Sequence, residues 1–265
     1  MTAGKQRTLT TRAFGAEPGM PDLSSLADWV AERRGSRGDL TTFLLEQSLA
    51  PQQEAEVGVP CAGGKFYRNH ILESLLGQDG QAITGEIGVD HGTVIADMAD
   101  LVAMAKGVSV AMPAPHLLGL ADQYFHDEDE VSLSLTGAYR SLMRAMRDAG
   151  CGGHVLICDR IDEEEVSALA KKKVFFFHPA PAQEDFEILL EHQQQVAVRR
   201  QDLGIALSLT DEYDIFGLVI LDPDSAAIRS ALLHRDSEKI VVGGYCTADC
   251  PDYWKSLVAS AVYRT

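Results

Sequence analysis

Short apolar runs alternate with longer amphipathic segments between Ala82 and Asp159, and this alternation constrains the fold more than any other feature. The runs are AITGEI at 82–87, VSVAM at 108–112 and HVLIC at 154–158. Each run gives way to glycine, proline or polar residues, and segments of 12 residues or more with helical spacing separate the runs. Strands that alternate with helices in this way predict repeated βα units and a parallel sheet.

The rest of the chain continues the pattern. Apolar runs at 174–177, 217–221 and 240–245 predict further buried strands, and GVPCAGGKF at 58–66 predicts a short strand and loop. Helices are expected between these strands, including one long helix from Gln183 to Asp202. Residues 8–14 and 204–209 are also strand-like, and the sequence leaves open whether either segment joins the sheet.

Chain length favours one domain over residues 1–265. The 265 residues match the ~250 typical of a (β/α)8 TIM-type barrel, and no linker or internal repeat divides them. Counting gives seven or eight strands. A complete barrel and a barrel with a missing or rearranged last strand are therefore both open, and in the second case a partner subunit would cover the gap.

Composition excludes several classes of function. The formal net charge of −16 argues against a nucleic-acid partner, because phosphate binding needs clustered lysine and arginine. No apolar run approaches the ~18 residues of a membrane span, and the first residues have no signal-like apolar region. Five widely spread cysteines do not form a secreted disulfide pattern. We expect a cytoplasmic protein with a small-molecule substrate, and the sequence leaves open a homo-oligomer.

In an α/β barrel, the residues that follow the strands form the functional face. Several residues with reactive or charged side chains end or follow the apolar runs, so we expect them to meet at one rim. They are Glu86, His116, Asp159, His178, Asp222, Cys246 and Cys250, joined by Lys65 and Arg160 nearby. Two of these positions also have a purely structural interpretation. Asp222 precedes Pro223 and Ser225 and could begin a helix, and Asp159 could only pair with Arg160 to hold a loop.

Three motifs resemble the catalytic barrel of cobalamin-independent methionine synthase, a relative of uroporphyrinogen decarboxylase. ITGEI resembles its V/I-x-G-x-I strand, the run ending at Pro113-Ala114-Pro115 resembles its Gly-Pro-x-Thr turn, and AGCGGHVLICD at 149–159 resembles its AGC-x-x-I-Q-I-D-E-P strand. The resemblance implies a TIM-type barrel and a methyl- or alkyltransferase acting on a small amine- or carboxylate-bearing substrate. It also implies that Asp159 holds the substrate's amino group. Their shared place after buried strands makes Glu86, Asp159 and His178 the expected catalytic residues.

The resemblance is incomplete at the substrate-binding positions. Arg160 replaces an acid of the family motif, Lys65 stands where the family has glutamate, and His116 lies in the Gly-Pro-x-Thr turn. We assign these residues, with Asp222, to substrate binding. The changes of charge suit a zwitterion or an anion.

The family's zinc site is largely lost. His178 matches the histidine of an H-x-C motif, but Ala180 replaces its cysteine, and three of the four family ligands are absent. Cys246 and Cys250 could meet His178 to form a substitute Cys2His zinc site, although two thiols without a metal are the alternative. A methyltransferase is therefore the first hypothesis. A metal-independent lyase or decarboxylase of the uroporphyrinogen decarboxylase type is the second, and a non-catalytic binding or partner subunit is the third.

Overall fold

Eight parallel strands follow one another around the centre of the computed structural model, which describes residues 6–33, 37–209, 212–213, 215–247 and 250–264. In the described residues, these strands are β2 (Thr10–Ala16), β3 (Cys61–Gly63), β6 (Ser109–Pro113), β8 (Gly153–Ile157), β9 (Val174–Phe177), β10 (Gln195–Arg199), β11 (Gly217–Leu221) and β12 (Ile240–Cys246). One sheet has the order β3-β6-β8-β9 and the other has the order β10-β11-β12-β2. Val59, which precedes β3, joins the two sheets by exchanging backbone hydrogen bonds of 2.9 and 3.0 Å with Thr11 and Ala13 of β2.

The strand order is that of a (β/α)8 barrel, but the barrel is not closed. Within the described part of the chain, no ladder joins β9 to β10. The side chain of Gln193 takes the place of a neighbouring strand: its Oε1 accepts the Phe176 amide at 3.0 Å, and its Nε2 donates to the Phe176 carbonyl at 3.3 Å. The sequence left open a complete barrel and one with a missing or rearranged last strand. The described chain forms an open barrel, but the gap lies between β9 and β10, where a buried side-chain amide satisfies backbone groups that would otherwise require a strand.

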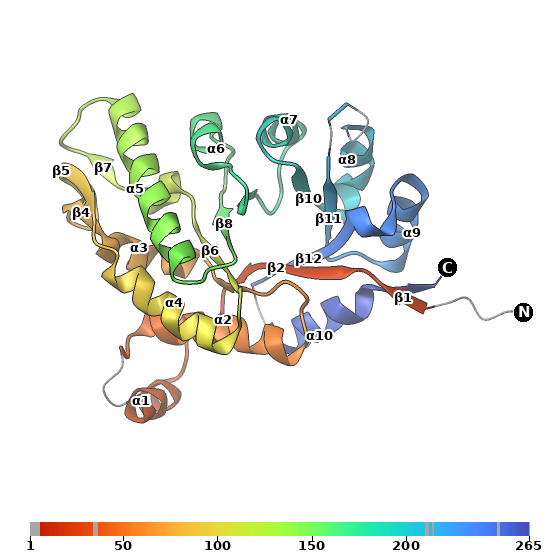
Figure 1. Cartoon of the computed structure of the whole chain (residues 1–265), viewed down its shortest axis with the longest axis horizontal. Helices are drawn as coiled ribbons and strands as arrows, with labels where there is room; N and C mark the ends of the chain where they lie inside the picture. The colour runs from red at the N-terminus through yellow and green to blue at the C-terminus, as the bar shows by residue number, and fades with distance from the viewer. Residues whose placement is uncertain (1–5, 34–36, 210–211, 214, 248–249, 265) are drawn as a thin grey trace, which may run out of the picture.

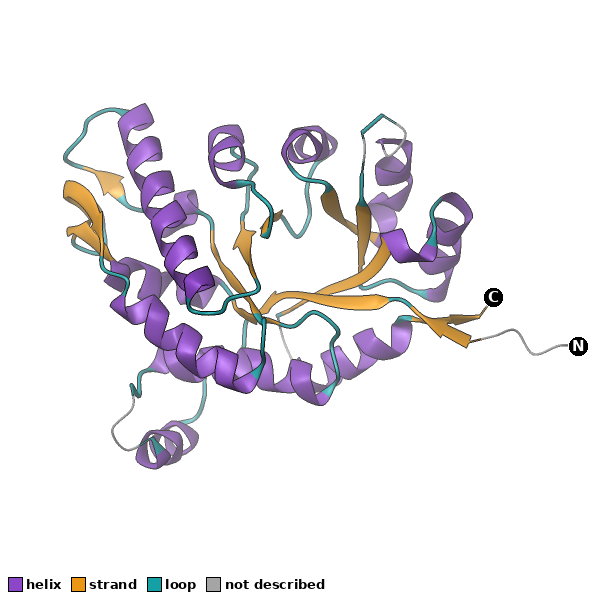
Figure 2. Cartoon of the chain, viewed as in Figure 1, coloured by secondary structure: helices purple, strands orange, loops and turns teal. Residues whose placement is uncertain are grey.

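Helices surround the strands (Figures 1 and 2). They are α1 (Leu23–Glu32), α2 (Leu40–Glu54), α3 (Arg68–Ser74), α4 (Gly92–Met104), α5 (Glu128–Asp148), α6 (Glu163–Leu169), α7 (Gln183–His192), α8 (Leu203–Leu209), α9 (Ser225–His234) and α10 (Cys250–Ser260). Several begin after an aspartate whose carboxylate accepts backbone N–H groups of the first turn, among them Asp127 before α5 and Asp162 before α6. No described helix is long and apolar enough to cross a membrane.

Two sequence predictions need correction between β9 and β11. The segment 183–202 is not one helix, because α7 ends at His192 and β10 begins at Gln195. The β-branched Val196 and Val198 are buried in β10, where such side chains pack well. Residues 204–209 lie in helix α8 and not in a strand. Residues 8–14 largely form β2, and β12 pairs with β2 in parallel, which joins the last barrel strand of the described residues to the first.

The strand predicted at 82–87 does not belong to the barrel. It forms part of β5 (Ala82–Val89), which pairs with β4 (Leu75–Gln78) antiparallel and with β7 (Ala121–Asp122) parallel. This separate small sheet lies beside α5, at the left of Figure 1. Glu86 is exposed on it and does not follow a barrel strand, so the expected place of Glu86 on the rim is wrong. Periodicity could not separate a hairpin strand from a barrel strand here.

Short elements complete the described chain. They are the 3-10 helices η1 (Lys65–Tyr67), η2 (Pro115–Leu118), η3 (Arg200–Asp202) and η4 (Ser237–Lys239), and the antiparallel pair β1 (Gln6–Thr8) with β13 (Val262–Arg264). The 3-10 helix η2 begins two residues after β6 ends. Inside the strands, the ring of Phe14 stacks on Phe177 with centroids 4.6 Å apart and lies 5.0 Å from Phe175. Aromatic packing therefore fills the interior.

Candidate active site

His116 lies between two carboxylates at the end of β6. Its Nδ1 is 2.8 Å from Oε2 of Glu165, and its backbone N–H donates to Oε1 of the same residue at 2.7 Å. On the other side of the ring, Nε2 is 3.1 Å from Oδ1 of Asp159. The three side chains form a continuous chain of hydrogen bonds from the protein interior to its surface.

The parallel sheet explains why these residues meet. His116 follows β6 and Asp159 follows β8, and these strands are neighbours, so their carboxyl ends lie at the same edge. Glu165 lies in the first turn of α6. The side chains of His116 and Glu165 are 6% and 7% exposed, whereas that of Asp159 is 61% exposed. Asp159 follows a buried apolar strand, but its side chain faces solvent at the outer end of this chain of hydrogen bonds.

This arrangement can move a proton and bind a cation. A doubly protonated imidazole donates from both nitrogens, so it would satisfy Glu165 and Asp159 together. Among the described residues, Oδ2 of Asp159 has no hydrogen-bond partner and is available to a positively charged group. His116 could then donate the Nε2 proton to a reacting atom while Glu165 fixes the ring.

A cavity of about 660 Å³ lies beside His116, between η2 and the first turns of α5 and α6. Asp122 orders the loop on one side by accepting the backbone N–H groups of Tyr124, Phe125 and His126 at 2.6–3.0 Å. These hydrogen bonds, that of Tyr124 first, lower the pKa of Asp122. The lining is rich in acids: Asp122, Asp127, Glu128, Asp162, Glu164 and Glu165. Its electrostatics therefore favour a cationic or amine-bearing ligand.

Arg160 does not pair with Asp159. Its guanidinium lies 3.6 Å from Asp162, the residue that caps α6, and it lines the same cavity. The structural alternative in which Asp159 and Arg160 only tie down a loop is therefore wrong. Arg160 remains a candidate for binding a carboxylate group at the edge of the cavity.

His178 supports Asp159 through the backbone. Its Nε2 lies 2.8 Å from the carbonyl oxygen of Asp159, and its Nδ1 accepts the Ala180 amide at 3.0 Å. One ring nitrogen thus contacts the loop that follows β8, and the other is used within the loop that follows β9. The structure brings His116, Asp159 and His178 to one edge, with His178 in contact with the Asp159 main chain.

The predicted zinc ligands do not fit a zinc ion in this arrangement. Both nitrogens of His178 already have partners, and Cys246 and Cys250 form a disulfide with each other. Residues 248 and 249 between the two cysteines lie outside the described residues. No group of three or more histidine, cysteine, aspartate or glutamate side chains suited to a metal occurs in the part of the chain that the structure describes.

Asp222 lies elsewhere on the rim, after β11. Tyr253 of α10 donates its hydroxyl proton to Oδ1 of Asp222 at 2.7 Å. Burial raises the pKa of Asp222, and this effect outweighs the hydrogen bond from Tyr253 and the nearby Arg200. Asp222 does not cap the following helix as one interpretation proposed, because Asp224 accepts the N–H groups that begin α9.

Lys65 belongs to a second set of hydrogen-bonded residues on the rim, centred on Glu17. The sequence analysis did not identify this set. Glu17, which follows β2, accepts the backbone N–H of Lys65 at 2.6 Å and also accepts the hydroxyl of Tyr245. Glu17 donates its own backbone N–H to the Cys246 carbonyl at 2.7 Å. This group ties β2, β3 and β12 together, while the Lys65 side chain stays exposed.

Glu165 is the most important residue that the sequence did not identify. It is the third glutamate of the run EEE at 163–165, which is typical of an acidic first turn on a helix surface. Only the phase of α6 separates the buried Glu165 from its exposed neighbours. That phase could have suggested it, because Val166 and Leu169 mark the inward face.

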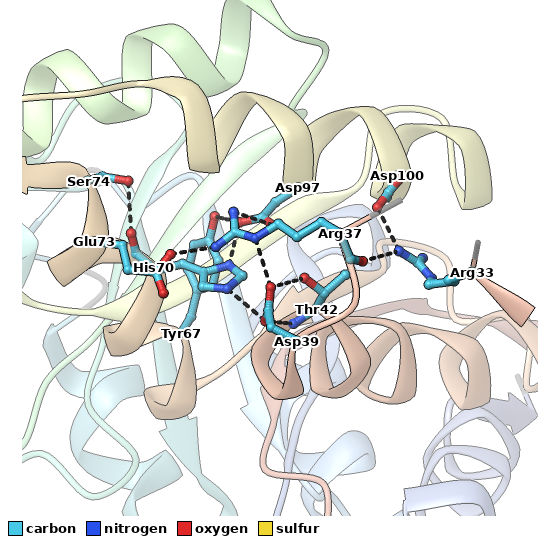
Figure 3. Close-up of polar contacts among 10 residues, drawn as sticks. All are labelled: Arg33, Arg37, Asp39, Thr42, Tyr67, His70, Glu73, Ser74, Asp97 and Asp100. Carbon is cyan, nitrogen blue, oxygen red and sulfur yellow. Dashed lines mark hydrogen bonds and ion pairs between the residues drawn. The ribbon is translucent and has the colours of Figure 1, made fainter. Parts of the chain in front are cut away.

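A second buried polar cluster lies among α2, α3 and α4 (Figure 3). His70 is 1% exposed and has its Nδ1 2.8 Å from Asp97 Oδ2 and its Nε2 3.0 Å from Asp39 Oδ1. Tyr67 donates to the same Asp97 oxygen at 2.9 Å, and burial followed by the Asp97 charge raises the pKa of Tyr67. Arg37 contacts Asp39 at 2.8 Å. The cluster connects three helices, and we assign it a structural role.

Comparison with known proteins gives similarity of structure only. No profile of a known protein family matches the chain, and no curated protein matches it. A B12-independent methionine synthase of a Shewanella species, solved with selenomethionine, superposes with a TM-score of 0.65 at 14% identity over 96% of both chains. A Listeria monocytogenes protein, provisionally assigned as a vitamin B12-independent methionine synthase, gives a TM-score of 0.54 at 17% identity, over 96% of this chain and 98% of that one. The chain shares the fold of these methionine-synthase-like proteins.

Proposed function

We propose that this protein is a methyl- or alkyltransferase that binds a small amine-bearing substrate at Asp159 and uses His116 as a proton donor. The observation that carries the proposal is the Glu165–His116–Asp159 chain of hydrogen bonds beside an acid-rich cavity. The shared fold with methionine-synthase-like proteins adds support for a small amino acid as the substrate.

The residues can assist the transfer in a defined way. The nucleophilic atom of the substrate forms a bond to the alkyl carbon as the bond between that carbon and the donor breaks. The leaving atom keeps the electron pair and takes the Nε2 proton of His116. Glu165 holds the imidazole ring in place through its contact with Nδ1. Asp159 holds the substrate ammonium by a charge-assisted hydrogen bond, and Arg160 can contact a carboxylate at the cavity edge.

The acid-rich lining does not favour the decarboxylase alternative. Substrates with several carboxylates need cationic walls, whereas this cavity has Arg160 as its one arginine or lysine among the described lining residues. Repulsion from six lining carboxylic acids would weaken the binding of such a substrate.

Calorimetric titration with methionine and selenomethionine tests the proposal. We expect one binding site for each amino acid, and no binding of 4-(methylthio)butanoate, which lacks the amino group. His116→Gln should still bind the amino acids, because the ammonium contact is made by Asp159. Equal affinity for the analogue without the amino group, or no binding of either amino acid, would contradict the proposal.

A further inference from the structure

A second cavity, of about 690 Å³, lies at the opposite ends of the strands, where β9 and β10 separate. It is lined by the residues that begin β9 and β10 and by Arg12, Lys171–Lys173, His192 and Phe216. The described lining contains no aspartate or glutamate. This is unusual in a chain with 39 acidic residues against 23 lysines and arginines.

Arg12 is a partly buried cation without an acidic partner. Its Nη1 donates to Oε1 of Gln195 at 2.7 Å, and its Cζ lies 4.6 Å from the ring centroid of Phe175 and 5.0 Å from that of Phe14. In the described part of the chain, no carboxylate lies within ion-pair distance of it. Burial lowers the pKa of Arg12, in keeping with a charge that lacks a counter-charge. An anion in the cavity would supply one.

Three consecutive lysines stand at the edge of the same cavity. Lys171, Lys172 and Lys173 are exposed and form the turn between α6 and β9, closed by the Val174 amide on the Lys171 carbonyl at 2.9 Å. Lys173 has a φ of 75°, a left-handed conformation that glycine adopts at lower cost. The chain thus keeps a charged side chain at a position where its backbone favours glycine.

We propose that this cavity binds a small polyanion that carries at least two phosphate or carboxylate groups. The planar guanidinium of Arg12 can form paired hydrogen bonds with one such group, and the lysines act as point charges for another. The volume lies within the ~300–1,000 Å³ of small-molecule sites. A nucleic acid is disfavoured by the net charge of −16.

The anion site is independent of the proposed active site. Arg12 lies in the first half of β2 and Lys173 precedes β9, whereas His116, Asp159 and His178 follow the carboxyl ends of their strands. The two ends of a parallel sheet are separate faces. A ligand at one face therefore does not need the chemistry of the other.

Titration of the full-length protein with pyrophosphate and, separately, with citrate tests this site at low and high ionic strength. We expect one site for at least one of these anions, weakened at least tenfold by Arg12→Gln and at least threefold by replacing Lys171, Lys172 and Lys173 with glutamine. Preference for pyrophosphate or for citrate distinguishes a phosphate from a carboxylate ligand. Arg144→Gln, which removes an exposed charge on α5, is the control and should leave the affinity unchanged.

Two results would overturn the proposal. One is the absence of binding of either anion at millimolar concentration. The other is unchanged binding in the triple lysine variant, which alters an exposed turn and should fold normally even if Arg12→Gln does not. In either case the amino-acid titration of the other face remains interpretable, because its residues are not changed.

Discussion

Glu165 contacts His116 through both of its carboxylate oxygens, one on the backbone N–H at 2.7 Å and the other on Nδ1 at 2.8 Å. This double contact fixes the position of the main chain and the orientation of the imidazole together. The opposite nitrogen, Nε2, is thereby directed to Asp159 at the surface. A histidine held in this way is prepared to transfer a proton without first reorienting.

Glu165→Gln should reduce the free energy of unfolding by about 1.5–3 kcal/mol, the range for a hydrogen bond to a charged group. The amide keeps the size of the side chain but offers only one oxygen to two donors. Chemical denaturation measures the change. Glu163→Gln is the matched control, because it removes an exposed charge from the same helical turn and should cost less than about 0.5 kcal/mol. Equal losses in the two variants would contradict the role given to Glu165.

Asp97→Asn should be strongly destabilising, because Tyr67 and His70 both bond the same buried carboxylate oxygen of Asp97. Each hydrogen bond to a charged group is worth about 1.5–3 kcal/mol, so the expected loss is about 3–6 kcal/mol. Asp100→Asn is the matched control. Asp100 lies one turn further along α4, where its carboxylate contacts Arg33 and its side chain is 42% exposed. That surface change should cost no more than about 1 kcal/mol. A similar cost for both would show that the cluster in Figure 3 does not hold the helices together.

Gln193→Leu should destabilise the edge of β9 that faces β10. The variant keeps an apolar side chain of similar size but leaves the Phe176 amide and carbonyl without the partners that Gln193 provides. Each unsatisfied buried group costs about 1–3 kcal/mol. Hydrogen exchange of the Phe176 amide should accelerate more than that of amides in β6. Unchanged exchange at Phe176 would mean that its amide does not depend on Gln193.

His154 should make the protein sensitive to acid. Burial, with a smaller contribution from Arg147, lowers its pKa from 6.5 to about 3, and neither ring nitrogen has a hydrogen-bond partner among the described residues. Below pH 6.5 the unfolded chain binds a proton that the folded protein does not bind until about pH 3. The stability contributed by the neutral ring is therefore lost progressively as the pH falls through this window.

Comparison with His154→Leu isolates this effect. Between pH 7.5 and 5.0, the free energy of unfolding of the native protein should fall by about 2 kcal/mol more than that of the variant. Urea denaturation at the two pH values measures the difference. Parallel losses would show that His154 is protonated equally in the folded and unfolded states.

Much of the fold could be predicted because the buried strands are continuous apolar runs. The strands ending at Met112, Cys158 and Phe177 were placed to within one residue of β6, β8 and β9. The strand β10 was missed, because Gln193–Arg199 continues the helical spacing of α7 without a glycine or proline to end it. Tertiary pairing with β11 decides its conformation.

The candidate site was predictable where it depends on strand ends and not where it depends on helix phase. His116, Asp159 and His178 follow buried strands, and the structure brings them to one edge. Glu165 required knowledge of which face of α6 turns inward. The pairing of Cys246 with Cys250, and not with a metal at His178, depended on a loop geometry that C-x3-C spacing does not determine.

The most direct test of the central claim is the affinity of Asp159→Asn for methionine. The variant keeps the size of the side chain but removes the charge, and because the Asp159 side chain is 61% exposed, the fold should be unaffected. Loss of a charge-assisted hydrogen bond of about 1.5–3 kcal/mol predicts a weakening of about tenfold to over a hundredfold in Kd. Asp148→Asn, an exposed change at the far end of α5, should leave Kd unchanged. Unchanged affinity in Asp159→Asn, with the thermal stability lowered instead, would make Asp159 part of the scaffold and contradict the proposed amine site.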